Sequence, residues 1–89
     1  MKVPEKYLPL GSVVRLIGAT KTLMIYGRLQ LQSTSGHRWD YVACLYPEGN
    51  VGEEFNVFFD HDGIEEVYFL GYENQAEKAY NQQLLSLDA

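Results

Sequence analysis

Five segments of the chain are rich in the apolar, β-branched and aromatic side chains that favour β-strands. They span residues 12–17, 23–32, 38–46, 55–59 and 65–70. Turns that contain glycine, proline or several polar residues separate them, as they separate successive strands of an antiparallel sheet. The pattern therefore predicts five short strands between about residues 12 and 72.

Alternation within a segment predicts which side chains share a face of the sheet. The segment 23–32 alternates most clearly, with Leu23 and Ile25 on one face and Met24 and Arg28 on the other. We therefore expect a strand with one buried face and one wet face.

The faces of two further strands can also be predicted from the sequence. The segment 38–46 is apolar on both faces, which predicts a central strand of the sheet. In the segment 65–70, Val67 and Phe69 fall on one face, opposite Tyr68.

Near the C-terminus, the spacing of apolar residues changes from that of a strand to that of a helix. Asn74 is a suitable helix N-cap, and Glu77 three residues later completes a pair that resembles a capping box. The apolar positions that then recur at helical spacing are Ala76, Tyr80, Leu84 and Leu87. This pattern predicts a helix over residues 75–87, and a helix this short must dock on the sheet to persist.

The fold class that follows is mainly β, of the α+β type, in a single domain over residues 1–89. We expect a five-stranded antiparallel sheet that is curled, or a small SH3-like barrel, with the C-terminal helix packed on it.

Composition and charge restrict the function. Hydrophobic residues make up 46% of the 89 residues and charged residues 21%, which argues against disorder. The net charge of −5 disfavours nucleic-acid binding. Residues 46–89 contain ten acidic residues and one basic residue, so an acidic face could meet a basic partner. We find no membrane segment or signal peptide and expect a cytoplasmic protein.

No set of residues indicates catalysis, so we expect a protein that is not an enzyme and has no catalytic residues. Cys44 lies between Ala43 and Leu45 in a predicted strand, which favours a buried structural thiol over a nucleophile. The only histidines are His37 and His61, and a catalytic pair would require one of them to lie beside Cys44 or a serine in space.

The segment from Asp60 through Asp62 to Gly63 matches the middle of a calcium-binding loop. In that alignment the first and last ligand positions fall on Phe58 and Phe69, which cannot ligate an ion. We therefore expect a metal-free turn, and we expect no cofactor.

Aromatic and acidic residues are concentrated between residues 46 and 68. Alternation places Phe55 and Phe59 on one face of their strand and Phe58 on the other, which leaves Phe58 as a candidate for the surface. An apolar centre with a charged rim is typical of a protein interface. The candidate binding residues are Tyr46, Glu48, Glu53, Glu54, Phe58 and Tyr68.

Four stretches of the chain together resemble a small uncharacterised family of Gram-positive bacterial proteins, a domain of unknown function. They are residues 8–16, 24–28, 40–50 and 58–64, and the most specific part is Asp-Tyr-Val-Ala-Cys-Leu-Tyr-Pro-Glu-Gly. Members of this family are often encoded near type VII secretion genes and LXG-type toxins. The resemblance implies an accessory role there, with a secreted toxin or secretion component as the partner, and it carries no catalytic residues.

Two functions remain open. The first is a protein-interaction module, which fits the acidic half of the chain and the aromatic strands. The second is a β-barrel domain that binds a small ligand or an oligosaccharide on aromatic platforms. A homo-oligomer is compatible with either.

Overall fold

A computed structural model describes residues 3–5 and 7–88 of the 89-residue chain. The strands are β1 (Val13–Leu16), β2 (Thr22–Leu31), β3 (Arg38–Leu45), β4 (Val57–Phe59) and β5 (Ile64–Phe69). Two short 3₁₀ helices, η1 (Glu53–Phe55) and η2 (His61–Gly63), flank β4, and one α-helix, α1 (Gln75–Asp88), follows β5. The five predicted strands and the terminal helix are confirmed.

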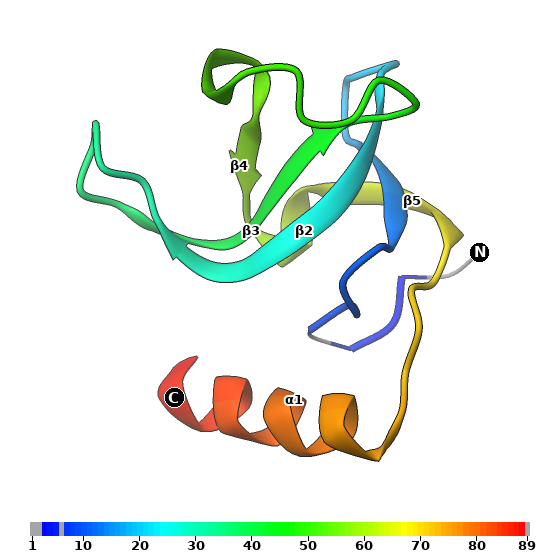
Figure 1. Cartoon of the computed structure of the whole chain (residues 1–89), viewed down its shortest axis with the longest axis vertical. Helices are drawn as coiled ribbons and strands as arrows, with labels where there is room; N and C mark the ends of the chain where they lie inside the picture. Colours follow the sequence, from blue (N-terminus) through cyan, green and yellow to red (C-terminus); the bar gives the residue numbers. More distant parts are fainter. Residues whose placement is uncertain (1–2, 6, 89) are drawn as a thin grey trace.

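The strands form one antiparallel sheet with the order β4-β3-β2-β1-β5. The sheet curls strongly, most visibly along the long β2–β3 hairpin (Figure 1). A barrel would require β4 to pair with β5, but these strands occupy opposite edges of the sheet. The curled open sheet is therefore confirmed, and the barrel alternative is wrong.

The two faces of the sheet have different surroundings. Residues 7–12 and the helix α1 lie beneath one face, which we call the covered face (Figure 1). Its core contains the buried side chains Tyr7, Leu8, Val14, Leu23, Ile25, Tyr41, Ala43, Phe59, Ile64, Val67 and Leu84. The opposite face, which we call the outer face, carries the alternate residues of each strand.

A β-bulge in β2 changes the predicted faces of that strand. Ile25 pairs with Ala43 and Gly27 pairs with Val42, so Tyr26 is the extra residue. Residues after a bulge change face, and Arg28 is therefore buried, with 7% of its surface exposed. The expectation that Arg28 lies on a wet face with Met24 was wrong.

A second bulge lies where β5 pairs with β1. Phe69 pairs with Val13 and Val67 pairs with Val14, which leaves Tyr68 as the extra residue. Val67 is buried, whereas Tyr68 and Phe69 are both exposed. The predicted pairing of Val67 and Phe69 on one face is wrong, because the bulge turns Phe69 outward beside Tyr68.

The strand β4 is shorter than the sequence predicts. Phe55 belongs to η1 and is exposed, while β4 begins at Val57. Within β4 the alternation holds: Phe59 is in the core, and Phe58 is half-buried on the outer face.

The helix α1 docks by a side that includes Leu84 of the predicted apolar stripe and is otherwise polar. The side chains of Glu77 and Asn81 and the buried Leu84 face the rest of the protein. Tyr80 and Leu87, which belong to the predicted apolar stripe, are exposed. The stripe was a poor guide because the docking surface includes a buried charge, Arg28, which needs an anionic partner. No helix among residues 3–5 and 7–88 is long and apolar enough to cross a membrane.

Candidate functional site

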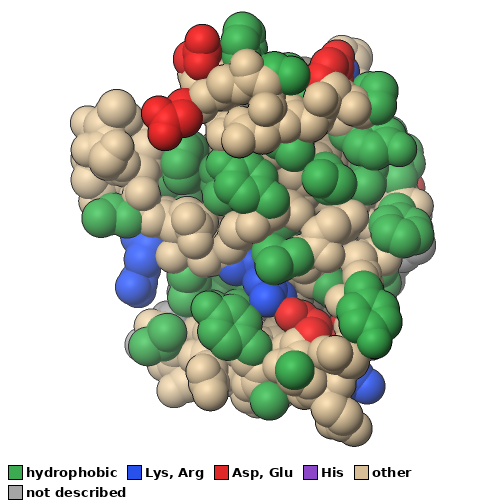
Figure 2. All heavy atoms as spheres, viewed as in Figure 1, with side chains coloured by type: hydrophobic (Ala, Val, Ile, Leu, Met, Phe, Trp, Pro, Cys, Tyr) green, Lys and Arg blue, Asp and Glu red, His purple; other side chains and the backbone are tan. Residues whose placement is uncertain are grey.

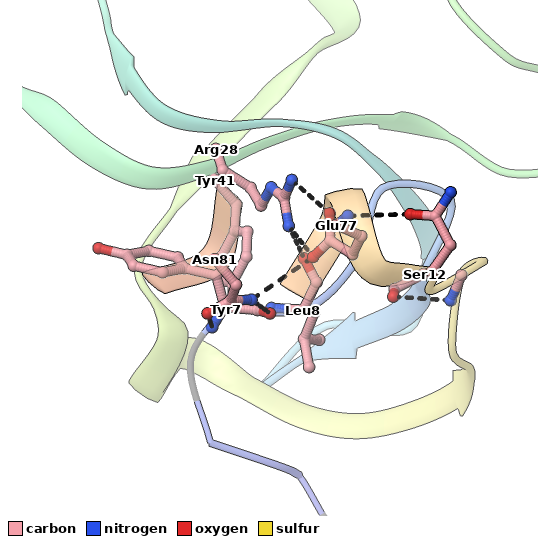
Figure 3. A network of polar contacts seen from close by, with 9 residues as sticks. Tyr7, Leu8, Ser12, Arg28, Tyr41, Glu77 and Asn81 are labelled. Atoms are coloured by element: carbon pink, nitrogen blue, oxygen red, sulfur yellow. Dashed lines mark hydrogen bonds and ion pairs between the residues drawn. The ribbon is translucent and has the colours of Figure 1, made fainter. Parts of the chain in front are cut away.

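The covered face contains a buried ion pair that joins β2 to α1. Arg28 donates to both carboxylate oxygens of Glu77, at 2.6 and 2.8 Å, and to the carbonyl oxygen of Leu8 at 3.3 Å (Figure 3). The guanidinium also lies 5.4 Å from the centre of the Tyr80 ring. Hydrogen bonding to Arg28 lowers the pKa of Glu77 below its usual range. The pair is bidentate and desolvated, so it fixes the position of the helix on the sheet.

Asparagine side chains complete the attachment of α1. The amide of Asn81 donates to the carbonyl oxygen of Tyr7 at 2.6 Å and accepts from its N–H at 3.3 Å (Figure 3). Asn74 caps the helix by accepting the N–H of Glu77 at 2.9 Å, which confirms the predicted cap. The carboxylate of Glu77 binds Arg28 instead of closing the predicted capping box.

Tyr41 forms a second buried polar centre on the covered face. Its hydroxyl accepts the N–H of Leu8 at 2.9 Å and lies 2.7 Å from Nδ1 of His61. The hydroxyl proton is thus directed to Nδ1, which leaves Nε2 of His61 to donate to the carbonyl oxygen of Pro4 at 2.8 Å. Burial raises the pKa of the Tyr41 phenol well above its usual value. These groups satisfy one another and have a structural role.

The outer face carries a groove, which we call the tyrosine groove. Its volume is about 730 Å³. The residues that line it are Gly11, Val13, Thr22, Met24, Tyr46, Pro47, Tyr68 and Phe69. Val13 and Met24 pair across β1 and β2 and form its floor, while Tyr46 and Tyr68 come from opposite sides of these strands. The tyrosine groove therefore brings together side chains that are half exposed and largely apolar.

Two basic side chains beside the tyrosine groove, Arg15 and Lys21, have hydrogen-bond partners within the protein. Arg15 donates through Nε to the hydroxyl of Tyr68 at 3.2 Å and through Nη1 to the carbonyl oxygen of Ala19 at 3.2 Å. Lys21 donates to both carboxylate oxygens of Glu48, at 2.8 and 2.9 Å, and this lowers the pKa of Glu48. Lys21 and Glu48 thus neutralise each other beside the groove, whereas Arg15 is held by two neutral oxygen atoms.

A second depression, which we call the acidic hollow, lies next to the groove along β2. Its volume is about 440 Å³. It is lined by Tyr26, Leu31, Gln32, Ser33, Thr34, Glu53, Glu54, Asn56 and Phe58. The amide of Asn56 donates to the hydroxyl of Tyr26 at 2.7 Å. Burial, with smaller contributions from Cys44 and Glu53, raises the pKa of Tyr26. Figure 2 shows hydrophobic side chains gathered over the sheet, with acidic side chains along the upper edge.

Five of the six predicted binding residues fall into two neighbouring groups. Tyr46 and Tyr68 line the tyrosine groove. Glu53, Glu54 and Phe58 line the acidic hollow. The sixth, Glu48, is occupied by its ion pair with Lys21.

Sequence reasoning missed the floor of the groove and one residue of each wall, Pro47 and Phe69. Val13 and Met24 look like ordinary strand residues, and Pro47 looks like an ordinary turn residue. Phe69 was placed on the wrong face by strict alternation. The one signal in the sequence was the local density of aromatic residues.

Two further predictions concern candidate chemistry. Cys44 is buried, as expected, and its Sγ lies 3.7 Å from the carbonyl oxygen of Met24. Asp60 accepts the N–H of Asp40 at 3.1 Å, and Asp40 accepts the N–H of His61 at 2.8 Å, so these carboxylates join segments that are 20 and 21 residues apart in the sequence. Within the described part of the chain, no group of three or more His, Cys, Asp or Glu residues could hold a metal ion.

Comparison with family models adds an identity to this geometry. The model described as Domain of unknown function (DUF4176) matches residues 7–80 of the chain. The chain belongs to this family. Comparisons with curated proteins and with solved structures gave no match.

The DUF4176 match covers the whole sheet and the first part of α1. It includes both members of the buried pair, Arg28 and Glu77, and the lining of both depressions on the outer face. The description of the family assigns no activity, so a function for this DUF4176 domain has to be argued from the two faces of the sheet.

Proposed function

We propose that this domain is a protein-interaction module that binds its partner on the outer face of the sheet. The observation that carries this proposal is the tyrosine groove. Tyr46, Tyr68 and Phe69 each expose about half of their surface there, at 46%, 50% and 59%. Half-exposed aromatic side chains that cluster around an apolar hollow are typical of interaction surfaces.

The chemistry of the groove favours a protein partner over an enzymatic substrate. The groove contains two tyrosines and one threonine as its polar side chains, and its lining includes no histidine, carboxylate, lysine or cysteine that could act as a general base. The polar networks that could carry chemistry, around Arg28 and Tyr41, lie on the covered face and are engaged with partners inside the protein. We therefore propose a binding function without catalysis.

The groove also favours a protein over the alternative of a small ligand or oligosaccharide. A sugar requires several converging hydrogen-bonding groups, whereas Val13, Met24, Pro47 and Phe69 offer none from their side chains. An apolar surface next to charged side chains matches the core and rim of a protein interface. A protein partner therefore complements both the apolar groove and the charged side chains next to it better than a sugar does.

The proposed biological setting is an accessory role in type VII secretion, with a secreted toxin or a secretion component as the partner. Support for this setting comes from the motif resemblance, whose most specific stretch ends at Gly49 and contributes Tyr46 and Pro47 to the groove. A cytoplasmic site of action belongs to the same proposal. The single cysteine, Cys44, is consistent with a reducing compartment.

Quantitative affinity purification from the organism that encodes the chain tests this proposal. Tagged wild-type protein is compared with Tyr68→Ser and with the matched control Tyr72→Ser, since Tyr72 is 80% exposed and lies outside the groove. We expect one near-stoichiometric partner that the control retains and that Tyr68→Ser recovers at least about tenfold less well. Equal recovery by all three proteins would contradict the proposal.

A further inference from the structure

We infer that the partner presents an extended, proline-rich segment to the tyrosine groove, with an arginine or lysine that enters the acidic hollow. This inference rests on the proposed function, because it names the ligand of the same outer face. Four features of the two depressions support it: the position of the groove in the sheet, its aromatic walls, its free hydroxyls and the uncompensated charge beside it.

The position of the groove excludes strand addition as the binding mode. Its floor is formed by β1 and β2, which are interior strands with neighbours on both sides. The backbone donors and acceptors of interior strands are already used within the sheet. An extended ligand that crosses this floor cannot become a sixth strand, so its own backbone groups must be satisfied in another way.

A polyproline II segment meets this condition. It has no internal hydrogen bonds, and its carbonyl groups point outward. Each proline also removes a backbone N–H group that would otherwise be left without an acceptor. Its flat apolar rings fit between aromatic walls, which is how such segments are commonly recognised. Here Tyr46 and Pro47 form one wall, and Tyr68 with Phe69 forms the other.

The two tyrosine hydroxyls can act as donors to the carbonyl groups of such a segment. The hydroxyl oxygen of Tyr68 accepts a hydrogen bond from Arg15, which leaves its own proton free to donate. The Tyr46 hydroxyl has no hydrogen-bond partner within the described residues. The groove thus presents hydrogen-bond donors where a proline-rich ligand presents acceptors.

The acidic hollow supplies the complementary charge. Glu53 and Glu54 line it without an ion-pair partner among residues 3–5 and 7–88, and none of the lining residues is basic. The aromatic rings of Tyr26 and Phe58 lie in the same hollow, and aromatic rings favour a guanidinium group over an ammonium group. We therefore favour arginine over lysine at this position.

The spacing between the two sites sets the distance between proline and arginine. Met24 in the groove and Tyr26 in the hollow are two residues apart on β2, which corresponds to roughly 7 Å. A polyproline II segment advances about 3.1 Å per residue, so the basic residue is expected about two or three positions beyond the proline that contacts Met24.

Selection from a phage-displayed library of random dodecapeptides tests this inference even while the partner is unidentified. Wild-type protein is the target, and the double variant Tyr46→Ser/Tyr68→Ser serves for counter-selection. The expected enriched peptides contain two or more prolines with an arginine or lysine close by. Enrichment of peptides without prolines, of amphipathic helical sequences or of nothing above background would overturn the inference.

Charge-reversal variants then test the acidic hollow with one synthetic enriched peptide. Glu53→Lys/Glu54→Lys is expected to weaken binding at least about tenfold at low salt and to remove most of its salt dependence. The matched control Glu65→Lys/Glu73→Lys changes the net charge equally at exposed positions outside both depressions and should bind within about twofold of wild type. Equal weakening by both variants would show a general charge effect and contradict a site at Glu53 and Glu54.

The two proposals fail in distinguishable ways. If the partner recovered from cells depends on Tyr68 while the peptide selection yields no proline-rich consensus, the interaction function stands and the proline-rich ligand is wrong. If the recovered partner is insensitive to Tyr68→Ser, the proposed function itself is wrong.

Discussion

The two faces of this sheet use tyrosine in opposite ways. On the covered face, Tyr41 is fully buried and its hydroxyl is engaged by Leu8 and His61. On the outer face, Tyr46 and Tyr68 are about half exposed and stand at the walls of a groove. The same side chain thus closes a polar network on one side and leaves donors open to a ligand on the other.

Charge differs between the faces in the same way. Arg28 and Glu77 neutralise each other inside the protein, with 4% and 12% of their side chains exposed. Glu53 and Glu54 lie at the surface without such partners among the described residues. Satisfied polar groups stabilise a fold and unsatisfied ones are free to bind a ligand, so we assign stability to the covered face and recognition to the outer face.

The largest expected effect comes from breaking the buried pair. Glu77→Ala leaves the Arg28 guanidinium buried without its counter-charge and should lower the free energy of unfolding by about 3 kcal/mol. Urea denaturation measures this loss. The matched control is Glu73→Ala, which removes an exposed glutamate just before α1 and should cost less than about 0.5 kcal/mol. Similar losses in the two variants would contradict a stabilising role for the pair.

A smaller loss is expected from Tyr41→Phe. The substitution keeps the ring but removes the hydroxyl that accepts the N–H of Leu8 and bonds to His61. Leaving these buried groups unsatisfied should cost about 2 kcal/mol. Tyr46→Phe is the control on the outer face and should be neutral. Thermal unfolding of both variants checks the difference, and an unchanged melting temperature for Tyr41→Phe would argue against the network.

Lowering the pH should reduce the contribution of Glu77 to the free energy of unfolding. Its pKa is lowered in the folded state, so its contribution to stability is fully present above the unfolded value, about 4.3, and is lost as the pH falls through the folded value. The difference in unfolding free energy between wild type and Glu77→Gln should therefore shrink as the pH is lowered from 6 to 3. A difference that stays constant over this range would contradict the assignment.

The smallest effect on stability is expected on the outer face. Tyr46→Ser/Tyr68→Ser removes two half-exposed rings and one exposed hydrogen bond from Arg15, so it should cost less than about 1 kcal/mol. Urea denaturation measures this as well. A loss as large as that of Glu77→Ala would mean that these tyrosines belong to the core.

The main features of the fold are predictable because strand and helix periods are local properties of the sequence. The β-bulges are not, since an extra residue leaves no mark in an alternating pattern. One bulge turned Arg28 into the covered face, and another turned Phe69 out of it. Once Arg28 is buried, the helix must present Glu77, which explains why the apolar stripe failed to predict how α1 docks.

The sequence indicated several residues that line the two depressions, but it did not indicate how these residues are arranged. The aromatic and acidic density between residues 46 and 68 drew attention to Tyr46, Tyr68 and Phe58, which line the two depressions. Their division between two depressions depends on the strand order, which brings the end of β3 and the end of β5 to opposite sides of β1 and β2. Such contacts between distant segments are set by tertiary structure, which period-two alternation does not encode.

Site-specific photo-crosslinking in living cells tests the division between the two faces most directly. A benzoyl-phenylalanine residue replaces Tyr46, Tyr68 or, as the exposed control outside the groove, Tyr72. We predict that the Tyr46 and Tyr68 positions crosslink to one and the same protein and that the Tyr72 position does not. Crosslinks of equal yield and identity at Tyr72, or none at the two groove positions, would contradict the assignment of recognition to the outer face.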